Sequence, residues 1–308
     1  MSLSIHRASL EERRAAHRNS HEEWGGEETV TAYLERCLAS PRHNRAEWWV
    51  LRLDGEIAAS LALHPLSFRY AGQSLSGFGI GSVHTVSEMR RQGHAMALCR
   101  AAMNAALARG DRFGLLFSDI APDYYARLGF RICPHERFTC PDLTRLVDSG
   151  ERCLLEPFEG RENIGFLIES HEGHHRDDVL ALWRDRSDWR FLLDANADLR
   201  FLRLRDQDGT ALGYAWIHQD DSQLVPVELV LNQPDVAVEA RAYRALAEFA
   251  LSRSISKISG WNPPPDSIFD YFSVTPRSKG IPMLWVDPDV LVAGKLAAGI
   301  RLYSSAYF

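Results

Sequence analysis

Alternating apolar and polar residues in the first part of the chain predict a run of antiparallel strands. Two dipeptides typical of tight turns, Asp54-Gly55 and Ala71-Gly72, separate the apolar-rich segments. The residues before these segments predict a short strand followed by two helices. The predicted strands are Ser2–Ala8, Glu47–Leu53, Ile57–Tyr70 and Gln73–Val86, and the predicted helices are Glu11–Trp24 and Glu28–Ala39.

A helix with apolar residues on most of its faces follows this meander. It covers Met96–Arg109, so it is expected to be well buried, and Gly110 is suited to end it. The apolar run Phe113–Phe117 then predicts a buried strand, parallel to its predecessor through a right-handed crossover. A short helix over Ala121–Leu128 and a strand over Phe130–Cys140 are expected next.

The second half of the chain repeats this order from about residue 153 onward. We therefore predict two tandem domains, 1–150 and 151–308, of the α/β (α+β) class. Each would have a mixed, mostly antiparallel sheet flanked by helices. The predicted helices of the second half are Asn163–His174, Val179–Asp194, Val238–Arg253 and Asp266–Phe272, and its strands are Leu199–Arg205, Ala211–Gln219, Leu224–Leu231, Lys257–Trp261 and Pro282–Val286.

The junction between the strand ending at Val86 and the helix starting at Met96 has the features of an anion site. A turn of the form Arg-x-x-Gly-x-Ala, from Arg90 to Ala95, presents several backbone N–H groups at a helix N-terminus. Gly93 lets the backbone approach a ligand, and the arginines add positive charge. The turn lacks the Gly-Lys-Ser/Thr of a P-loop and the three glycines of a Rossmann fingerprint.

This turn resembles motif A of the GCN5-related N-acetyltransferases (GNAT), which holds the pyrophosphate of acetyl-CoA. The alternative is an ordinary strand–loop–helix with a basic cap. The resemblance implies an acetyl-CoA site formed by Val83, His84, Thr85, Arg90, Arg91, Gln92, Gly93, His94, Ala95 and Met96.

A second segment, Tyr125–Phe130, resembles GNAT motif B, with its Tyr-x-Arg-Leu-Gly-Phe signature. In this family, two parallel strands splay apart and the pantetheine arm lies between them; here these are the strands around Val83 and Leu116. The resemblance places the phenol of Tyr125 near the thioester sulfur, where it could protonate the departing thiolate. The backbone N–H of Thr85 is a candidate oxyanion donor.

The general base is less clearly indicated. The strand before motif A has no carboxylate between Ser76 and Ser82. In this respect, and in its tandem domains, the chain resembles the enhanced intracellular survival (Eis) acetyltransferases, whose C-terminal carboxylate enters the active site. That resemblance implies Phe308 as the base. It departs in one respect, since Eis members carry a third, sterol-carrier-like domain. His84, His64 and a water chain are the alternatives.

Two features of the second half bear on its function. The turn equivalent to motif A, Leu231–Val238, has neither glycine nor arginine, and Asp235 would repel a phosphate. We therefore expect a degenerate copy that shapes the acceptor pocket.

The segment His171–His175 fits the His-Glu-x-x-His pattern of zinc proteases. Gly173 weakens the helix, however, so we expect these residues at the exposed end of the helix, with no metal bound.

Composition narrows the partners and the compartment. The net charge of -6 argues against a nucleic-acid partner, and no apolar run is long enough for a membrane span. Five cysteines without a Cys-x-x-Cys pair indicate a reducing, cytoplasmic setting. The composition is compatible with both a monomer and a homo-oligomer.

The predicted function is acetyl transfer from acetyl-CoA to a primary amine of a small molecule or peptide, by direct attack in a ternary complex. The alternative is a non-catalytic acyl-CoA-binding regulatory module.

Overall fold

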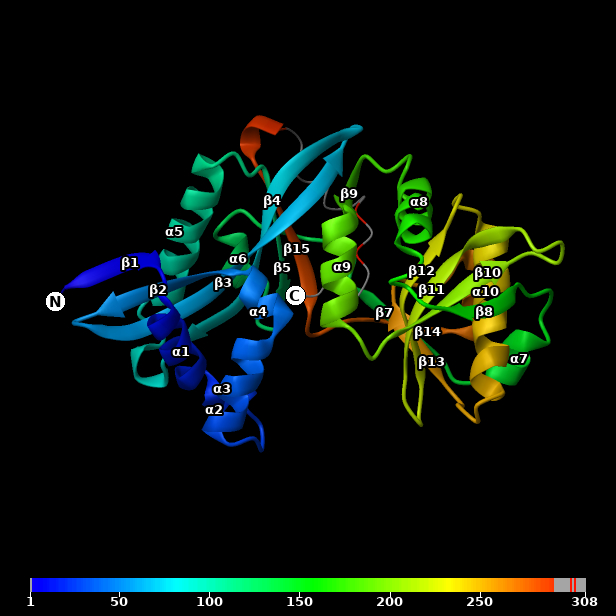
Figure 1. Cartoon of the computed structure of the whole chain (residues 1–308), viewed down its shortest axis with the longest axis horizontal. Coiled ribbons are helices and arrows are strands. Elements are labelled where there is room, and N and C mark those ends of the chain that lie inside the picture. Colours follow the sequence, from blue (N-terminus) through cyan, green and yellow to red (C-terminus); the bar gives the residue numbers. More distant parts are fainter. Residues whose placement is uncertain (1, 291–299, 301, 303–308) are drawn as a thin grey trace. The chain divides into compact units, whose positions relative to one another are not determined.

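The first sheet contains the predicted meander and continues it with a parallel pair. In the computed structural model, which describes residues 2–290, 300 and 302, its strand order is β1-β2-β3-β4-β5-β15-β6 (Figure 1). β1 to β4 pair antiparallel, and β5 runs parallel to β4 as predicted. The strands are β1 (Leu3–Arg7), β2 (Glu47–Leu53), β3 (Glu56–Tyr70), β4 (Gln73–Thr85), β5 (Phe113–Ser118), β6 (Arg131–Ile132) and β15 (Ile281–Val286).

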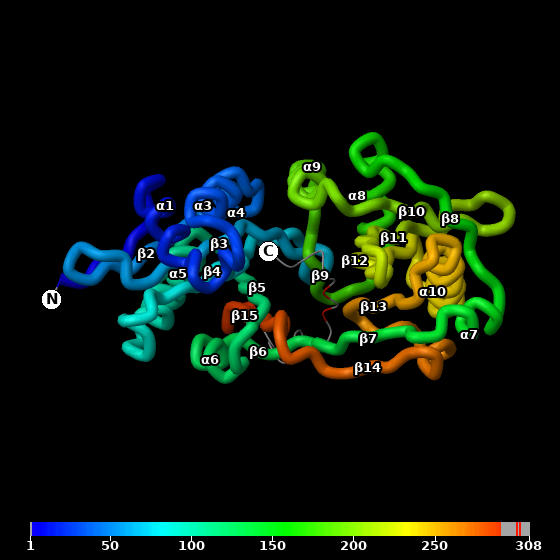
Figure 2. Tube along the Cα trace, turned by 90° about the horizontal axis from the view of Figure 1, so that it is seen from below, coloured from blue at the N-terminus to red at the C-terminus, as the bar shows by residue number. Residues whose placement is uncertain are grey.

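Helices cover both faces of this sheet. Helices α1, α3 and α4 lie on one face, and α5 and α6 lie on the other (Figure 2). Because side chains alternate along a strand, Trp48 of β2 faces α1 while Trp49 joins the core beneath α5. The helices are α1 (Leu10–Asn19), α2 (His21–Trp24), α3 (Val30–Ala39), α4 (Pro41–Arg45), η1 (Ser87–Met89), α5 (His94–Ala108), α6 (Asp123–Ala126) and η3 (Pro288–Val290).

The second sheet has the strand order β14-β7-β13-β12-β11-β10-β8. Neighbouring residues of β11 face opposite ways, so Tyr214 and Trp216 pack with α8 and α9, whereas Ala215 and Ile217 pack with α10. The elements between residues 136 and 276 are β7 (Glu136–Cys140), α7 (Leu143–Val147), β8 (Leu154–Phe158), α8 (Ile164–His174), β9 (Leu180–Trp183), α9 (Arg186–Ala195), β10 (Arg200–Arg205), β11 (Ala211–Gln219), β12 (Leu224–Leu231), α10 (Val236–Leu251), β13 (Ile258–Trp261), η2 (Asp266–Tyr271) and β14 (Ser273–Pro276). Of these strands, β9 is not part of the second sheet.

Each compact unit contains a strand from the other half of the sequence. The first unit comprises described residues 2–132 and 282–290, and the second comprises 133–281 with 300 and 302. The predicted strand over Phe130–Cys140 is divided into β6, in the first sheet, and β7, in the second. Similarly, β15 lies between β5 and β6 of the first sheet. The chain therefore passes between the units twice, at residues 132–133 and 281–282. The sequence, in contrast, predicts a single boundary near residue 150.

The helix predicted over Val179–Asp194 is wrong in its first part. Leu180–Trp183 is a strand, and the helix begins only at Arg186. Asp185 caps it, because its carboxylate accepts from the backbone N–H groups of Ser187 and Asp188 at 2.7 and 2.8 Å. The Asp-x-x-Asp capping box marks this helix start in the sequence.

None of the helices in the described part of the chain has the length and apolar character required to cross a bilayer.

Candidate active site

The parallel pairing of β4 with β5 ends long before β4 itself ends. The paired residues run from Gly77 with Phe113 to Ile80 with Leu116, yet β4 continues to Thr85 and β5 to Ser118. Beyond Ile80, β4 stays paired with β3 on its other side. The strands therefore open a gap on the β5 side, where β4 presents backbone polar groups that need other partners.

A bulge and the register of β4 direct one backbone donor into this gap. Ser82 has a positive φ of 49°, and the pairing with β3 shifts at this point. After the bulge, Val86 donates its N–H to the Ala58 carbonyl of β3 at 3.0 Å. Because bonding directions alternate along an antiparallel strand, the N–H of Thr85 points away from β3. It is thus placed to donate to a ligand in the gap.

The turn between β4 and α5 exposes a row of unpaired donors. Arg91 and Gly93 both have left-handed backbones, with φ of 62° and 85°, and Gly93 is the N-cap of α5. Among the described residues, the backbone N–H groups of 91–96 meet no acceptor. Successive free N–H groups at a helix N-terminus attract an anion through their own dipoles and that of the helix.

The Arg90 side chain, predicted to help bind the cofactor, contacts two elements of the first unit. Its Nε donates to the carbonyl of Thr85 at 3.0 Å, and its Nη2 pairs with the Glu23 carboxylate of α2. The guanidinium therefore links the end of β4 to α2. In the described structure it is engaged with these partners, whereas Arg91 is exposed beside the turn.

Tyr125 lies in the core cluster beneath α5, and its side chain is 8% exposed. Burial raises the pKa of its phenol, so the hydroxyl keeps its proton across the physiological range. The Tyr124 ring lies 5.0 Å from the Tyr125 ring, edge to face. Within the described chain the Tyr125 hydroxyl has no hydrogen-bond partner, which leaves it available to donate.

The two candidate histidines lie in different surroundings. His84 is buried on β4. Its ring packs edge to face with the Trp24 ring, and the two ring centroids are 5.8 Å apart. Burial and then the Arg90 charge lower its pKa, so its imidazole is neutral at pH 7. Burial, followed by the nearby His43 and Arg42 charges, lowers the pKa of His64 to about 3, which makes it a poor base. Phe308 lies outside the described residues.

Comparison with known proteins identifies this region. Residues 4–133 match a family model described as an acetyltransferase (GNAT) domain. The chain carries a GNAT acetyltransferase domain, and the protein is an acyltransferase. The open gap and the free N–H groups lie within the matched residues.

Solved structures resemble nearly the whole chain. A probable N-acyltransferase from Enterococcus faecalis V583 has 13% identity and a TM-score of 0.73, covering 93% of this chain and 73% of its own. Eis1 from Mycobacterium abscessus has 14% identity and a TM-score of 0.58, covering 92% and 73%. A tandem GNAT protein of clavulanic acid biosynthesis has 12% identity and a TM-score of 0.51, covering 92% and 98%. The fold is thus that of tandem GNAT proteins. No curated protein sequence matches the chain.

Some residues near the GNAT site could not be predicted from the sequence. They lie on α2 and at the bulge of β4. Glu23 and Trp24, which contact Arg90 and His84, are far from motif A in sequence. Ser82 carries no signal for its positive φ, because serine is not a residue type that favours this conformation.

The equivalent turn of the second unit is closed by its own side chain. The carboxylate of Asp235 caps α10 and accepts from the N–H groups of Ala237 and Val238, at 2.8 and 3.0 Å. A side-chain anion thus occupies the position that is open in the first unit.

The His-Glu-x-x-His segment is buried, in contrast to its predicted exposed position. His171, His174 and His175 are 3%, 8% and 6% exposed. The Leu231 N–H donates to Nδ1 of His174 at 3.2 Å, and a Cβ at Gly173 would lie 2.3 Å from the Asn232 carbonyl. The absence of a side chain at Gly173 lets α8 approach the end of β12 closely, which explains why a glycine stands at this position.

The buried state of His64 predicts a pH dependence of stability. Its pKa is about 3 in the folded chain and near 6.5 when unfolded, so the unfolded state binds more protons between these values. The free energy of unfolding should be fully retained above pH 6.5 and fall by up to about 1.4 kcal/mol per pH unit below it. We expect His64→Asn to reduce this slope in urea unfolding between pH 7 and 4. The control His218→Asn, at a half-exposed histidine, should leave the slope unchanged. Equal slopes in the wild type and His64→Asn would refute the assignment.

Proposed function

We propose that the first unit binds acetyl-CoA and transfers its acetyl group to a primary amine of a small molecule or peptide. The observation that carries this proposal is the backbone left open beyond Ile80 and Leu116, next to the free N–H groups of residues 91–96. The pyrophosphate binds at the turn and the N-terminus of α5. The pantetheine arm bonds to β4 within the gap, as an added strand would.

The reaction proceeds by direct attack of the amine on the thioester carbonyl. The N–H of Thr85 donates to the carbonyl oxygen as it gains negative charge. The new C–N bond forms, the C–S bond breaks, and the Tyr125 hydroxyl gives its proton to the departing sulfur. The surplus amine proton passes to His84, and exchange with solvent then returns Tyr125 and His84 to their starting states.

The two proposed proton-transfer residues, Tyr125 and His84, lie on opposite faces of the sheet. Tyr125 belongs to the core on the α5 face, whereas His84 lies against Trp24 of α2. The acceptor therefore approaches from the α1–α4 face while the thiol leaves on the other. The raised pKa keeps the Tyr125 phenol protonated before the reaction, so it enters the reaction as a proton donor.

Replacing Tyr125 by Phe should lower kcat by about 10²- to 10⁴-fold, because the thiolate then leaves without a proton donor. The KM for acetyl-CoA should change little. Tyr124→Phe is the matched control, since it removes a neighbouring phenol and should keep activity. Release of free thiol from acetyl-CoA against a panel of amines measures both. Full activity of Tyr125→Phe would refute its role, and acetyl-CoA binding without turnover on any amine would favour the regulatory module.

Replacing His84 by Gln should lower kcat by a similar factor and flatten the acidic limb of its pH profile, since the proton acceptor is lost. Binding of coenzyme A, measured by calorimetry, should be retained. Unchanged turnover would contradict this role and favour the Phe308 carboxylate. In that case, residues appended after Phe308 should abolish turnover in an otherwise unaltered chain.

A further inference from the structure

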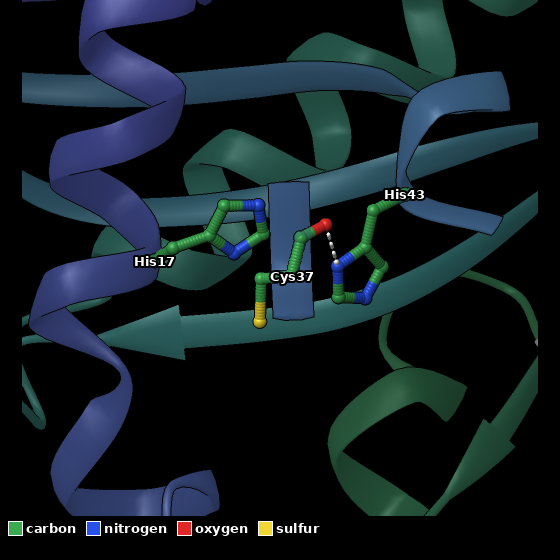
Figure 3. A group of neighbouring side chains, drawn as sticks. All are labelled: His17, Cys37 and His43. Atoms are coloured by element: carbon green, nitrogen blue, oxygen red, sulfur yellow. Dashed lines mark hydrogen bonds between the residues drawn. The ribbon is translucent and has the colours of Figure 1, made fainter. Parts of the chain in front are cut away.

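Three helices of the first unit bring together metal-binding side chains that the acetyl-transfer site does not use. His17 comes from α1, Cys37 from α3, and His43 from α4. One potential ligand atom from each lies within 4.8 Å of the others. Figure 3 shows the two imidazoles on either side of Cys37. The positions 17, 37 and 43 match no familiar metal-binding spacing, so this cluster could not be predicted from the sequence.

We propose that His17, Cys37 and His43 bind a zinc-class transition metal ion. Imidazole and thiolate are the ligands that zinc prefers in proteins. Zinc–ligand distances of about 2.0–2.3 Å place the donors of a tetrahedral site about 3.3–3.8 Å apart, so the present separation closes with small side-chain rotations. On binding, the Cys37 thiol releases its proton to solvent and becomes a thiolate.

The outer contacts hold the imidazoles in orientations suited to this role. Nδ1 of His43 bonds to the Cys37 carbonyl at 3.2 Å, which leaves Nε2 for an ion. The two imidazole rings are nearly parallel, with centroids 5.0 Å apart, and Trp48 lies edge-on to both. Nε2 of His17 accepts from Arg13 at 3.4 Å. An ion bound to Nδ1 requires a proton on Nε2, so ion binding breaks this long bond.

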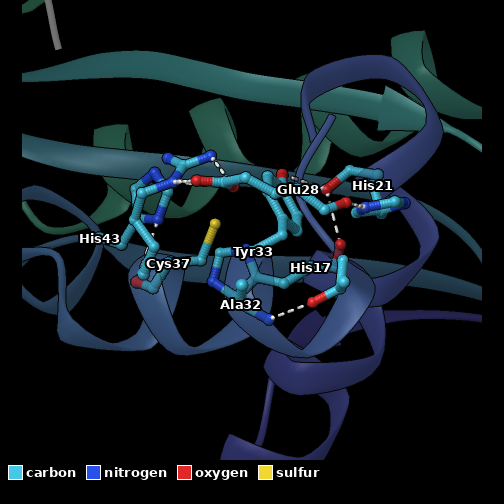
Figure 4. A network of polar contacts seen from close by, with 10 residues as sticks. His17, His21, Glu28, Ala32, Tyr33, Cys37 and His43 are labelled. Atoms are coloured by element: carbon cyan, nitrogen blue, oxygen red, sulfur yellow. Dashed lines mark hydrogen bonds and ion pairs between the residues drawn. The ribbon is translucent and has the colours of Figure 1, made fainter. Parts of the chain in front are cut away.

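One of the arginines beside the proposed ligands is neutralised within the protein. Arg36, beside Cys37 in the sequence, is paired with both carboxylate oxygens of Glu28. Figure 4 shows Glu28 and Cys37 within the same network of polar contacts. Arg13 is the cation in contact with a proposed ligand, and its long bond to His17 is supplemented by a 2.7 Å bond to Asn44. Arg13 can keep the Asn44 bond when an ion takes His17.

A cavity supplies both a path of entry and a fourth ligand position. The three proposed ligands line a pocket of about 210 Å³ together with Trp24, Tyr33 and Trp48. A site with three protein ligands and an open position can take a water molecule as the fourth. The Tyr33 hydroxyl also lines this pocket and is hydrogen-bonded to Ser20 Oγ at 3.0 Å.

Cobalt(II) titration of the full chain, after dialysis against a chelator, tests this proposal independently of acetyl transfer. We expect one cobalt ion per chain, with tetrahedral visible bands and a thiolate-to-cobalt charge-transfer band that zinc abolishes. Cys37→Ser should remove the charge-transfer band, and both Cys37→Ser and His43→Gln should weaken zinc binding by more than the roughly 10- to 100-fold effect of losing an outer contact.

Cys153→Ser, which changes a buried cysteine of the second unit, is the matched control and should retain both bands and affinity. Far-UV circular dichroism verifies that each variant is folded. The absence of a thiolate band in the wild type, or its persistence in folded Cys37→Ser, would overturn the proposal. Equal loss in folded Cys153→Ser would overturn it as well.

Discussion

Backbone polar groups inside a protein need partners, and β4 leaves several of its own unmatched where it parts from β5. The ladder ends at Ile80 and Leu116 although both strands continue. In an isolated chain this would cost free energy for every group withdrawn from water. A ligand that supplies hydrogen bonds along an extended arm offsets that cost. The bulge at Ser82 and the Arg90 bond to the Thr85 carbonyl hold β4 in this open arrangement.

The two units differ in how the free N–H groups at one helix N-terminus find acceptors. Each has a strand that leads to a buried helix, and each helix N-terminus has donors without internal partners. In the first unit, the left-handed backbones at Arg91 and Gly93 leave these donors open. In the second, the Asp235 carboxylate takes them. This difference supports our proposal that the first unit alone binds acetyl-CoA.

Local patterns in the sequence predicted the elements that frame the site. Alternation and turn dipeptides located β2, β3 and β4, and the apolar run located β5 parallel to β4. The segment Phe130–Cys140 was interpreted as one strand, because alternation cannot reveal that its ends join different sheets. The Arg90 pair with Glu23 was also missed, since a contact so distant in sequence depends on the tertiary fold.

The central claim is that one acetyl-CoA molecule binds per chain at the turn before α5, and calorimetric titration with coenzyme A tests it most directly. The account predicts one molecule per chain and loss of binding in Gly93→Val. A Cβ at Gly93 meets no atom within 4 Å, so the variant perturbs only the left-handed backbone. Gly55→Val, at a φ of 91° with equally open surroundings, is the matched control and should bind normally. Two molecules per chain, or unchanged binding by Gly93→Val, would contradict the account.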